Sequence, residues 1–226
     1  MTNIGFRIIQ IENPMSKELV DKFQGLATSL LSDNMNRLHA IGQNLRPYHK
    51  EGKLGGYAFT VKTRPGDNLM VHKAIDIAKP GDVIVVDAGG DLTNAIIGEI
   101  MIRLARKNGI NGFVIDGAIR DSSSISKGTL PVYARGVTNR GPYKDGPGEI
   151  NVPVSIDGMV VQPGDLVIGD EDGLVVIPPQ NAEQMIKLAQ QQQLEEKLIL
   201  QSIKDGSIDR KWIDETLRTK GCDGLY

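Results

Sequence analysis

The clearest candidates for chemistry are Arg120 and Asp121, which stand side by side after the apolar, glycine-containing stretch 112–119. Arginine offers a planar fork of N–H donors to a carboxylate or an enolate oxygen. Aspartate offers a hard oxygen ligand to a divalent cation. In open α/β sheets, ligands bind where strands end at their carboxyl edges. The pair therefore indicates an anion and metal site, although spacing alone favours an exposed ion pair or a helix N-cap.

Two glycine-containing segments precede this pair. Residues 83–95, VIVVDAGGDLTNA, predict a strand, a glycine turn and a helix whose first backbone N–H groups can receive an anion. They lack the G-x-G-x-x-G spacing of dinucleotide-binding sites, and a simple strand-to-helix turn explains them equally well. Residues 98–101, GEIM, place Gly98 inside a predicted helix, where glycine costs about 1 kcal/mol relative to alanine. That cost indicates a helix start, a kink, a close backbone approach or, most simply, close packing of helices.

Hydrophobic periodicity and turn residues predict the elements that position these residues. Helices are expected within residues 13–38 (N-cap Ser16, restart at Ser32-Asp33), 66–78, 92–109, 181–204 and 209–226. Strands are expected within residues 53–63, 79–90, 110–117, 129–136 and 162–173, with a hairpin turning at Asp157-Gly158. A Pro-Gly-Asp turn precedes two of these strands, and ordinary turn chemistry explains it better than a domain duplication.

Strands alternate with helices in the centre of the chain and pair as hairpins afterwards, and no linker-like break interrupts them. This order predicts an α/β fold with a mixed sheet. We expect one domain over residues 1–226, with an N-terminal helical segment, 1–28, and a C-terminal helical extension, 180–226.

Composition limits the classes of partner. The 226 residues are 40% hydrophobic and 24% charged, and the net charge is −2, so neither nucleic acid nor an anionic membrane is expected as a partner. Only 4% of the residues are aromatic, which disfavours platforms for base stacking. The single cysteine, Cys222, excludes an internal disulfide and fits a reducing cytoplasm. We expect no signal peptide, no membrane span and a cytoplasmic location.

Other polar residues give weaker signals. His39, His49 and His72 show no paired ligand spacing, which disfavours a histidine-based zinc site. His72 lies on an amphipathic helix and is expected to be packed. Asp67 and Asn68 could reach a site from the start of the same helix, although helix capping is the simpler explanation.

Residues 89–121, GGDLTNAIIGEIMIRLARKNGINGFVIDGAIRD, resemble the core signature of the RraA-like family. This family includes the 4-hydroxy-4-methyl-2-oxoglutarate and 4-carboxy-4-hydroxy-2-oxoadipate aldolases and the RNase E inhibitor RraA. Residues 131–178 resemble the aldolase branch especially. The resemblance implies a single-domain swivelling α/β/β sandwich, similar to phosphohistidine domains, with a mixed central sheet. It also implies a homotrimer or a dimer of trimers, with active sites between subunits.

The resemblance implies a role for each candidate residue. Arg120 binds the 2-oxo acid substrate and steadies an enolate, and Asp121 is the direct protein ligand to Mg²⁺ or Mn²⁺. The segment whose backbone amides hold the pyruvyl carboxylate matches Gly98, Glu99, Ile100 and Met101. A glutamate on the last helix of a neighbouring subunit orients a catalytic water, and Glu196 matches it best, with Glu195 next.

One position departs from the family pattern. Catalytic members usually carry an acidic residue three positions after the aspartate, where this chain has Ser124. A serine can hold a water but adds no charge, which puts metal affinity and activity in question. The leading hypothesis is a metal-dependent class II pyruvate aldolase of 4-hydroxy-2-oxo dicarboxylic acids with oxaloacetate decarboxylase activity. A non-catalytic regulator of an RNA-processing enzyme is the alternative. A methyltransferase ranks last, because no glycine-rich nucleotide loop is present.

Overall fold

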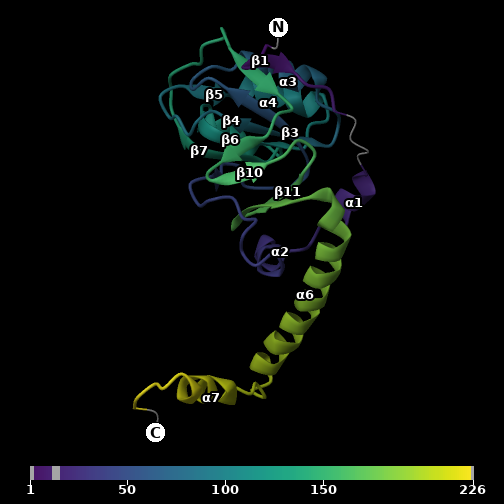
Figure 1. The fold of residues 1–226 in the computed structure, drawn as a ribbon, viewed down its shortest axis with the longest axis vertical. Coiled ribbons are helices and arrows are strands. Elements are labelled where there is room, and N and C mark those ends of the chain that lie inside the picture. The colour runs from purple at the N-terminus through teal and green to yellow at the C-terminus, as the bar shows by residue number, and fades with distance from the viewer. Residues whose placement is uncertain (1–2, 12–15, 225–226) are drawn as a thin grey trace.

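The computed structural model describes residues 3–11 and 16–224, and it consists of a sheet-centred body and a long helix that leaves it (Figure 1). The strands are β1 Phe6–Ile8, β2 Arg46–Pro47, β3 Leu54–Thr63, β4 Asp82–Asp87, β5 Ala95–Ile97, β6 Gly112–Ile119, β7 Val132–Val137, β8 Gly148–Ile150, β9 Val154–Ile156, β10 Met159–Val161, β11 Leu166–Asp170 and β12 Gly173–Ile177. The helices are α1 Lys17–Asp21, α2 Thr28–Asn34, α3 Leu69–Ile77, α4 Glu99–Lys107, α5 Ser122–Lys127, the 3₁₀ turn η1 Pro179–Asn181, α6 Ala182–Lys204 and α7 Lys211–Thr219.

The main sheet is mixed, as the sequence predicted. Its strands follow the order β1-β8-β3-β4-β6-β7-β2, with β5 beside β6, and β11 joining β3 to β12. Strands β3, β4, β6 and β7 run parallel, whereas β8 and β11 pair with β3 in the antiparallel sense. All eight residues of β6 are buried, which explains why this strand reads as a continuous apolar and small-residue run.

Three packed layers of side chains hold the body together. Helices α3 and α4 cover one face of the sheet, where Ile75, Ile84 and Phe113 are fully buried. The β9–β10 hairpin and the loop before β2 cover the opposite face. A third cluster packs α2 and the first half of α6 against β11 and β12. This layering is the predicted α/β/β sandwich.

The two Pro-Gly-Asp turns have the same local structure. Asp82 Oδ2 accepts the Lys79 N–H at 2.7 Å, and Asp165 Oδ2 accepts the Gln162 N–H at 2.8 Å. Burial raises the pKa of both carboxyls, that of Asp82 to about 6, and these N–H groups oppose the rise. Both aspartates therefore close turns, which confirms the simpler interpretation of the repeat.

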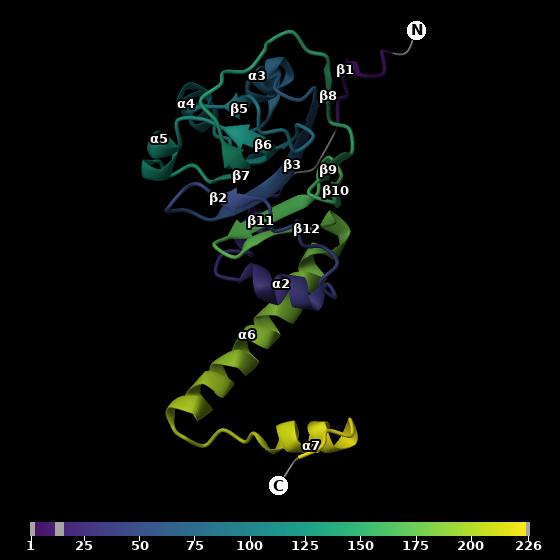
Figure 2. The ribbon, with the colours of Figure 1, turned by 90° about the vertical axis from the view of Figure 1, so that its left-hand side faces the viewer.

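The last two helices leave the body. Contacts such as Asn34 Nδ2 to Gln192 Oε1, 2.7 Å, hold the first half of α6 against α2. The last of these bonds joins Gln193 Nε2 to the Gly25 carbonyl. From Leu194 onward α6 projects away from the sheet, and α7 lies at its far end (Figures 1 and 2). We call residues 194–219 the arm.

Three local predictions were wrong. Residues Ala95–Ile97 form strand β5, and the helix predicted over 92–109 begins only at Glu99. The N-terminal segment contains strand β1 besides helix α1, while residues 12–15 lie outside the described part. The expected helix restart at Ser32 falls inside α2. The Ser16 N-cap is confirmed, since its Oγ accepts the Leu19 N–H. None of the helices within residues 3–11 and 16–224 is long and apolar enough to cross a membrane.

Candidate active site

Two neighbouring parallel strands bring Gly98 and Arg120 together. Strand β5 pairs with β6 so that Ile97 lies opposite Ile119, and these two residues are the last of their strands. The Arg120 N–H donates to the Ile97 carbonyl at 3.0 Å. Gly98 and Arg120 are 22 residues apart in the chain but are neighbours in the fold. They lie at the carboxyl edge of the sheet, where ligands of α/β proteins bind.

Gly98 is needed because Asp121 lies directly against it. The Asp121 Oδ2 accepts the Glu99 N–H at 2.9 Å and so satisfies the first free donor of α4. A Cβ at position 98 would lie 2.5 Å from that oxygen and 3.0 Å from Arg120 Cγ. Two of the reasons considered for this glycine are thus correct: it starts a helix, and it permits a close approach.

Arg120 and Asp121 do not form a tight surface ion pair. Their closest charged atoms, Arg120 Nε and Asp121 Oδ2, are 3.9 Å apart, and both side chains are 43% exposed. Asp121 precedes α5 with φ 59°, and its side chain makes no capping bond to that helix. Asp121 therefore caps α4 instead of the helix that follows it, and neither side chain is held in a tight ion pair.

Ser124 holds the carboxylate of Glu99. Its Oγ donates to Glu99 Oε2 at 2.8 Å, while Arg103 Nε donates to Glu99 Oε1 at 2.7 Å. The Ser124 hydroxyl, and after it the Arg103 guanidinium, lower the pKa of Glu99 below its ordinary value. The chain thus places a carboxylate next to position 124 from a different element. The sequence interpretation considered only the backbone amide of Glu99.

A cavity of about 110 Å³ opens in front of Arg120 and Gly98, with walls from α3, α4 and the loop after β7. Asn68, 2% exposed, donates to the Ile96 carbonyl at 2.8 Å. Its Oδ1 has no hydrogen-bond partner among the described residues. A buried amide oxygen without a donor favours a ligand group that donates a hydrogen bond.

The same cavity is lined by His72 and Lys144. Burial, and after it the charge of Lys144, lower the pKa of His72, so its imidazole is neutral at pH 7. Asp67 positions Lys144, because its Oδ2 accepts the N–H groups of Asp145 and Gly146 at 2.7 and 2.9 Å. Asp67 is therefore a structural anchor. Asn68, which the sequence considered together with it, faces the cavity.

Glu195 and Glu196 do not lie near these residues in their own chain. Both are exposed on the arm, where their recorded partners are Gln191 and Gln192 one turn earlier on α6. Figures 1 and 2 agree that α6 leaves the body on the side away from α4. Any contribution of either glutamate to the Arg120 site has to come from another copy of the chain.

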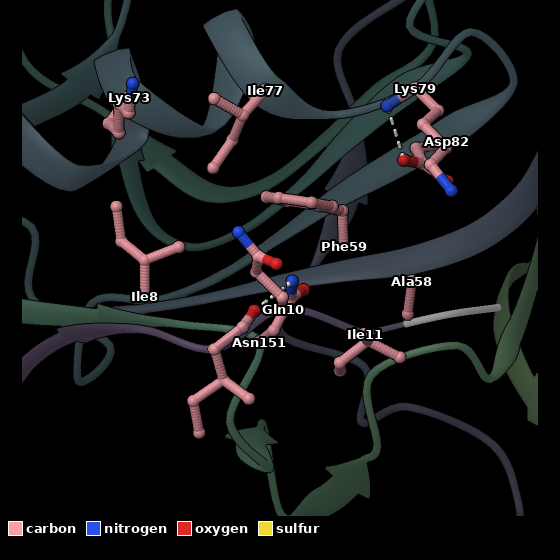
Figure 3. A pocket seen from close by; sticks show the side chains of 11 residues that line it. Ile8, Gln10, Ile11, Ala58, Phe59, Lys73, Ile77, Lys79, Asp82 and Asn151 are labelled. Carbon is pink, nitrogen blue, oxygen red and sulfur yellow. Dashed lines mark hydrogen bonds between the residues drawn. The ribbon is translucent and has the colours of Figure 1, made fainter.

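A larger hollow, about 540 Å³, lies away from this site between β1, α3 and β3 (Figure 3). Its walls are apolar side chains such as Ile8, Phe59 and Ile77, with Lys73 and Lys79 at its edge. Its acid, Asp82, already closes the turn described above. Size alone therefore does not identify the site, and the smaller cavity is the one that Gly98 and Arg120 line.

The donor atoms at the site suit a cation that keeps much of its water. Asp121 offers a carboxylate, with Glu99 beside it, and no cluster of three His, Cys, Asp or Glu side chains gathers within residues 3–11 and 16–224. Mg²⁺ is commonly bound through one or two carboxylates plus water, whereas closed zinc sites need four protein ligands. The residues present therefore fit Mg²⁺ or Mn²⁺.

Comparison with known proteins identifies the family of the chain. The RraA-like family, described as Aldolase/RraA, matches residues 28–176. A protein of Halalkalibacterium halodurans named "Putative 4-hydroxy-4-methyl-2-oxoglutarate aldolase" is 39% identical over 188 residues, covering 83% of this chain and 90% of the relative. A structure from Pseudomonas syringae, described as an uncharacterized protein, superposes with a TM-score of 0.77 at 30% identity, over 87% of this chain and 97% of that one.

A second structure carries a different description. The "RNA-processing inhibitor RraA" from Thermus thermophilis superposes with a TM-score of 0.63 at 31% identity, over 67% of this chain and 92% of that one. The chain belongs to the RraA-like family, as the residues around Arg120 and Asp121 indicated.

Proposed function

We propose that the chain is a divalent-metal-dependent class II pyruvate aldolase. It cleaves 4-hydroxy-2-oxo dicarboxylic acids of the 4-hydroxy-4-methyl-2-oxoglutarate type to pyruvate, and it decarboxylates oxaloacetate as a side activity. The observation that carries this proposal is the meeting of Arg120, Asp121 and the first turn of α4 at the ends of two parallel strands.

The first turn of α4 receives the substrate carboxylate. The Glu99 N–H is already bonded to Asp121, whereas the N–H groups of Ile100 and Met101 have no intrahelical acceptor. The positive end of the helix dipole favours an anion at this place. Arg120, beside Gly98, then faces the keto oxygen with its guanidinium.

Asp121 is the residue that holds Mg²⁺ or Mn²⁺. A bound ion supplies Lewis-acid polarisation of the keto oxygen. The role of Asp121 is to place that charge beside Arg120, and its bond to the Glu99 N–H fixes the carboxylate in this position. The left-handed backbone at Asp121 costs of order 1 kcal/mol, and such strain is commonly found at functional sites.

The cleavage breaks the C3–C4 bond, removes the proton of the 4-hydroxyl and returns a proton to C3. The 4-hydroxyl loses its proton and becomes a carbonyl while the bond between C3 and C4 breaks. The electron pair of that bond moves into the C2–C3 unit and forms the enolate of pyruvate. Arg120 stabilises the developing negative charge on oxygen, and C3 then takes up a proton. Loss of carbon dioxide from oxaloacetate gives the same enolate, so one site serves both reactions.

Glu99 supplies the acidic group that position 124 lacks. The Glu99 carboxylate lies within hydrogen-bond distance of the Ser124 hydroxyl, so it is next to the side chain that is acidic in the usual family pattern. We therefore expect Glu99→Gln to lower turnover. When Ser124→Asp is added to Glu99→Gln, the new carboxylate on residue 124 restores the negative charge, and activity should recover. Ser123→Asp, one residue away, should not restore it.

A partner subunit completes the site. Glu196 lies on the arm, which leaves its own body on the side away from α4. The proposal therefore needs a homo-oligomer, a trimer or a dimer of trimers, in which Glu196 of one copy orients the catalytic water of another. Asn68 and Lys144 line the part of the cavity that is left for the distal group of the substrate.

The second candidate is a regulator that binds an RNA-processing enzyme. It is favoured by the similarity to the Thermus protein described as an RNA-processing inhibitor. A regulator has no need for Arg120 to stand outside a tight ion pair on the wall of a cavity. We therefore place the lyase first.

Pyruvate release from oxaloacetate and from 4-hydroxy-4-methyl-2-oxoglutarate, with and without Mg²⁺ or Mn²⁺, tests the choice. The account predicts metal-dependent release by the protein, lost in Arg120→Ala and Asp121→Ala. Arg37→Ala is the matched control, because Arg37, just after α2, forms a surface ion pair of 2.9 Å with Asp33 on α2. No release above that of the metal alone, together with binding to a ribonuclease, would establish the regulator instead.

A further inference from the structure

The hollow of about 540 Å³ between β1, α3 and β3 has the size of a small-molecule site, and its apolar walls are open. Ile8 is 42% exposed and Ile77 37%, while Phe59, on the long strand β3, is only partly buried against the core. Figure 3 shows these three side chains around one space. Neighbouring apolar side chains that line a concave surface indicate a binding site.

One end of the hollow carries two opposite charges. Lys79 and Asp82 line it together, from the turn that joins α3 to β4. Figure 3 shows both at one end of the space, with Ile8 at the other. Among the described residues, neither side chain belongs to an ion pair. A ligand with both a positive and a negative group would therefore find a partner for each at this end.

Asp82 keeps one carboxylate oxygen without a partner, although the residue is only 5% exposed. Its Oδ2 accepts the Lys79 N–H, and no described residue donates a hydrogen bond to its Oδ1. Burial raises the pKa of this carboxyl to about 6, so it is mostly ionised at pH 7. A buried carboxylate oxygen without a donor favours a ligand that donates hydrogen bonds and carries positive charge.

The second Pro-Gly-Asp turn shows what the turn alone requires. Asp165 accepts the Gln162 N–H as Asp82 accepts that of Lys79. Asp165 does not line the hollow, and position 162 carries no charge. The lysine at position 79 and the contact of Asp82 with the hollow are therefore not needed to close such a turn.

We propose that this hollow binds an apolar α-amino acid. The α-ammonium group donates to Asp82 Oδ1, the α-carboxylate lies against Lys79, and an aliphatic or aromatic side chain packs on Phe59 and Ile77. The described residues that line this hollow and the Arg120 cavity are different, although α3 contributes to the walls of both. The site therefore goes beyond the proposed lyase and does not rest on it.

Titration calorimetry of the full chain at pH 7 tests the ligand class, with L-leucine and L-phenylalanine as probes. We expect both to bind, and L-alanine to bind at least about tenfold more weakly, because it lacks most of the apolar surface. Leucinamide lacks the carboxylate and 4-methylpentanoate lacks the ammonium group, so each should also bind at least about tenfold more weakly than leucine. Binding of neither leucine nor phenylalanine, or equal binding of leucine and 4-methylpentanoate, would overturn the proposal.

Variants of the two turns test the place of binding. Asp82→Asn keeps an oxygen for the Lys79 N–H but removes the charge, so leucine should bind at least about tenfold more weakly. Asp165→Asn, the same change in the second turn, should leave leucine binding unchanged. Lys79→Gln gives the first turn the residues of the second, which already folds with glutamine, and it should weaken binding as well.

Arg120→Ala separates the hollow from the lyase site, because the carboxylate of an amino acid could also bind beside α4. Leucine binding should be the same in Arg120→Ala and wild type, and circular dichroism establishes that each variant is folded. Loss of binding in Arg120→Ala, or full binding in folded Asp82→Asn and Lys79→Gln, would overturn the proposal. None of these measurements requires turnover, so failure of the lyase assay leaves them intact.

Discussion

The acidic groups of the proposed site are held in two different ways. In the body, Asp121 and Glu99 are fixed by bonds of 2.9 and 2.8 Å to a backbone N–H and to the Ser124 hydroxyl. On the arm, the hydrogen-bond partners of Glu195 and Glu196 within the described part of the chain are glutamines of their own helix. The body is thus preorganised before anything binds, whereas the proposed function requires a second copy to place the arm. Under that proposal, local bonds set the first half of the site and assembly sets the second.

The largest effect is expected at Asp121, the proposed metal ligand in the body. Asp121→Ala removes that carboxylate and frees the Glu99 N–H, so turnover of oxaloacetate should fall by roughly 10³-fold or more. Asp33→Ala, in the surface pair on α2, should leave it unchanged. Steady-state pyruvate assays at saturating metal measure both. Equal rates in Asp121→Ala and wild type would remove Asp121 from the site.

The arm is tested by mixing subunits. Glu196→Ala alone should lower kcat about 10²-fold or more, because a positioned proton-transfer group is lost. Mixed oligomers of Glu196→Ala with Asp121→Ala should regain activity, since some sites then combine an intact body with an intact arm. Mixing Asp121→Ala with Arg120→Ala, which damage the same half, should regain none. Recovery in neither mixture would mean that the halves do not come from different copies.

Replacing Gly98, which Asp121 approaches closely, should lower kcat by as much as Glu196→Ala does or by less. Gly98→Ala puts a methyl group 2.5 Å from Asp121 Oδ2, so the carboxylate must move, and a displacement near 1 Å costs about 10²-fold. Gly55→Ala is the control, because its new Cβ meets its nearest atom at 3.4 Å. Activity assays with a thermal melt separate catalysis from folding. An unaffected kcat in Gly98→Ala would show that this packing is irrelevant to turnover.

The smallest effect is expected at Ser124, and it depends on pH. The Ser124 hydroxyl is the main cause that lowers the pKa of Glu99, so Ser124→Ala lets that pKa rise towards its ordinary value. At pH 8 the carboxylate is ionised in both forms, and turnover should fall only about tenfold or less. As pH falls, the variant should lose activity first, so the acid limb of its kcat/KM profile moves to higher pH. If the acid limb of the kcat/KM profile is the same in Ser124→Ala and wild type, Ser124 does not act on turnover through Glu99.

The fold was predictable where one residue pattern decided one element. The apolar run of β6 and the Asp157-Gly158 turn gave the correct strand and hairpin, since each signal is local. The apolar residues of β5 also fit the helical spacing of the segment that follows. Only pairing with β6 decides that Ala95–Ile97 is a strand, and this pairing lies outside any local window.

The candidate site was likewise predictable only where local sequence carries the signal. Arg120 and Asp121 follow a strand directly, so chain position made them candidates, but spacing alone favoured an ion pair or a helix N-cap and only the family resemblance gave them a role. The sequence could not place Lys144, because its position depends on bonds from Asp67 to the following loop. The link between Ser124 and Glu99 joins two elements that only the fold brings together. The contribution of Glu196 depends on the assembly, so it stays a prediction.

The most direct test of the central claim is exchange of the pyruvate methyl protons in D₂O, followed by proton NMR. Exchange requires the enolate and no knowledge of the natural substrate. The account predicts exchange that needs both the protein and Mg²⁺ or Mn²⁺, that is lost in Asp121→Ala and Arg120→Ala, and that persists in Arg37→Ala. Absence of protein-dependent exchange under conditions where the wild type is folded and oligomeric would contradict the enolate site.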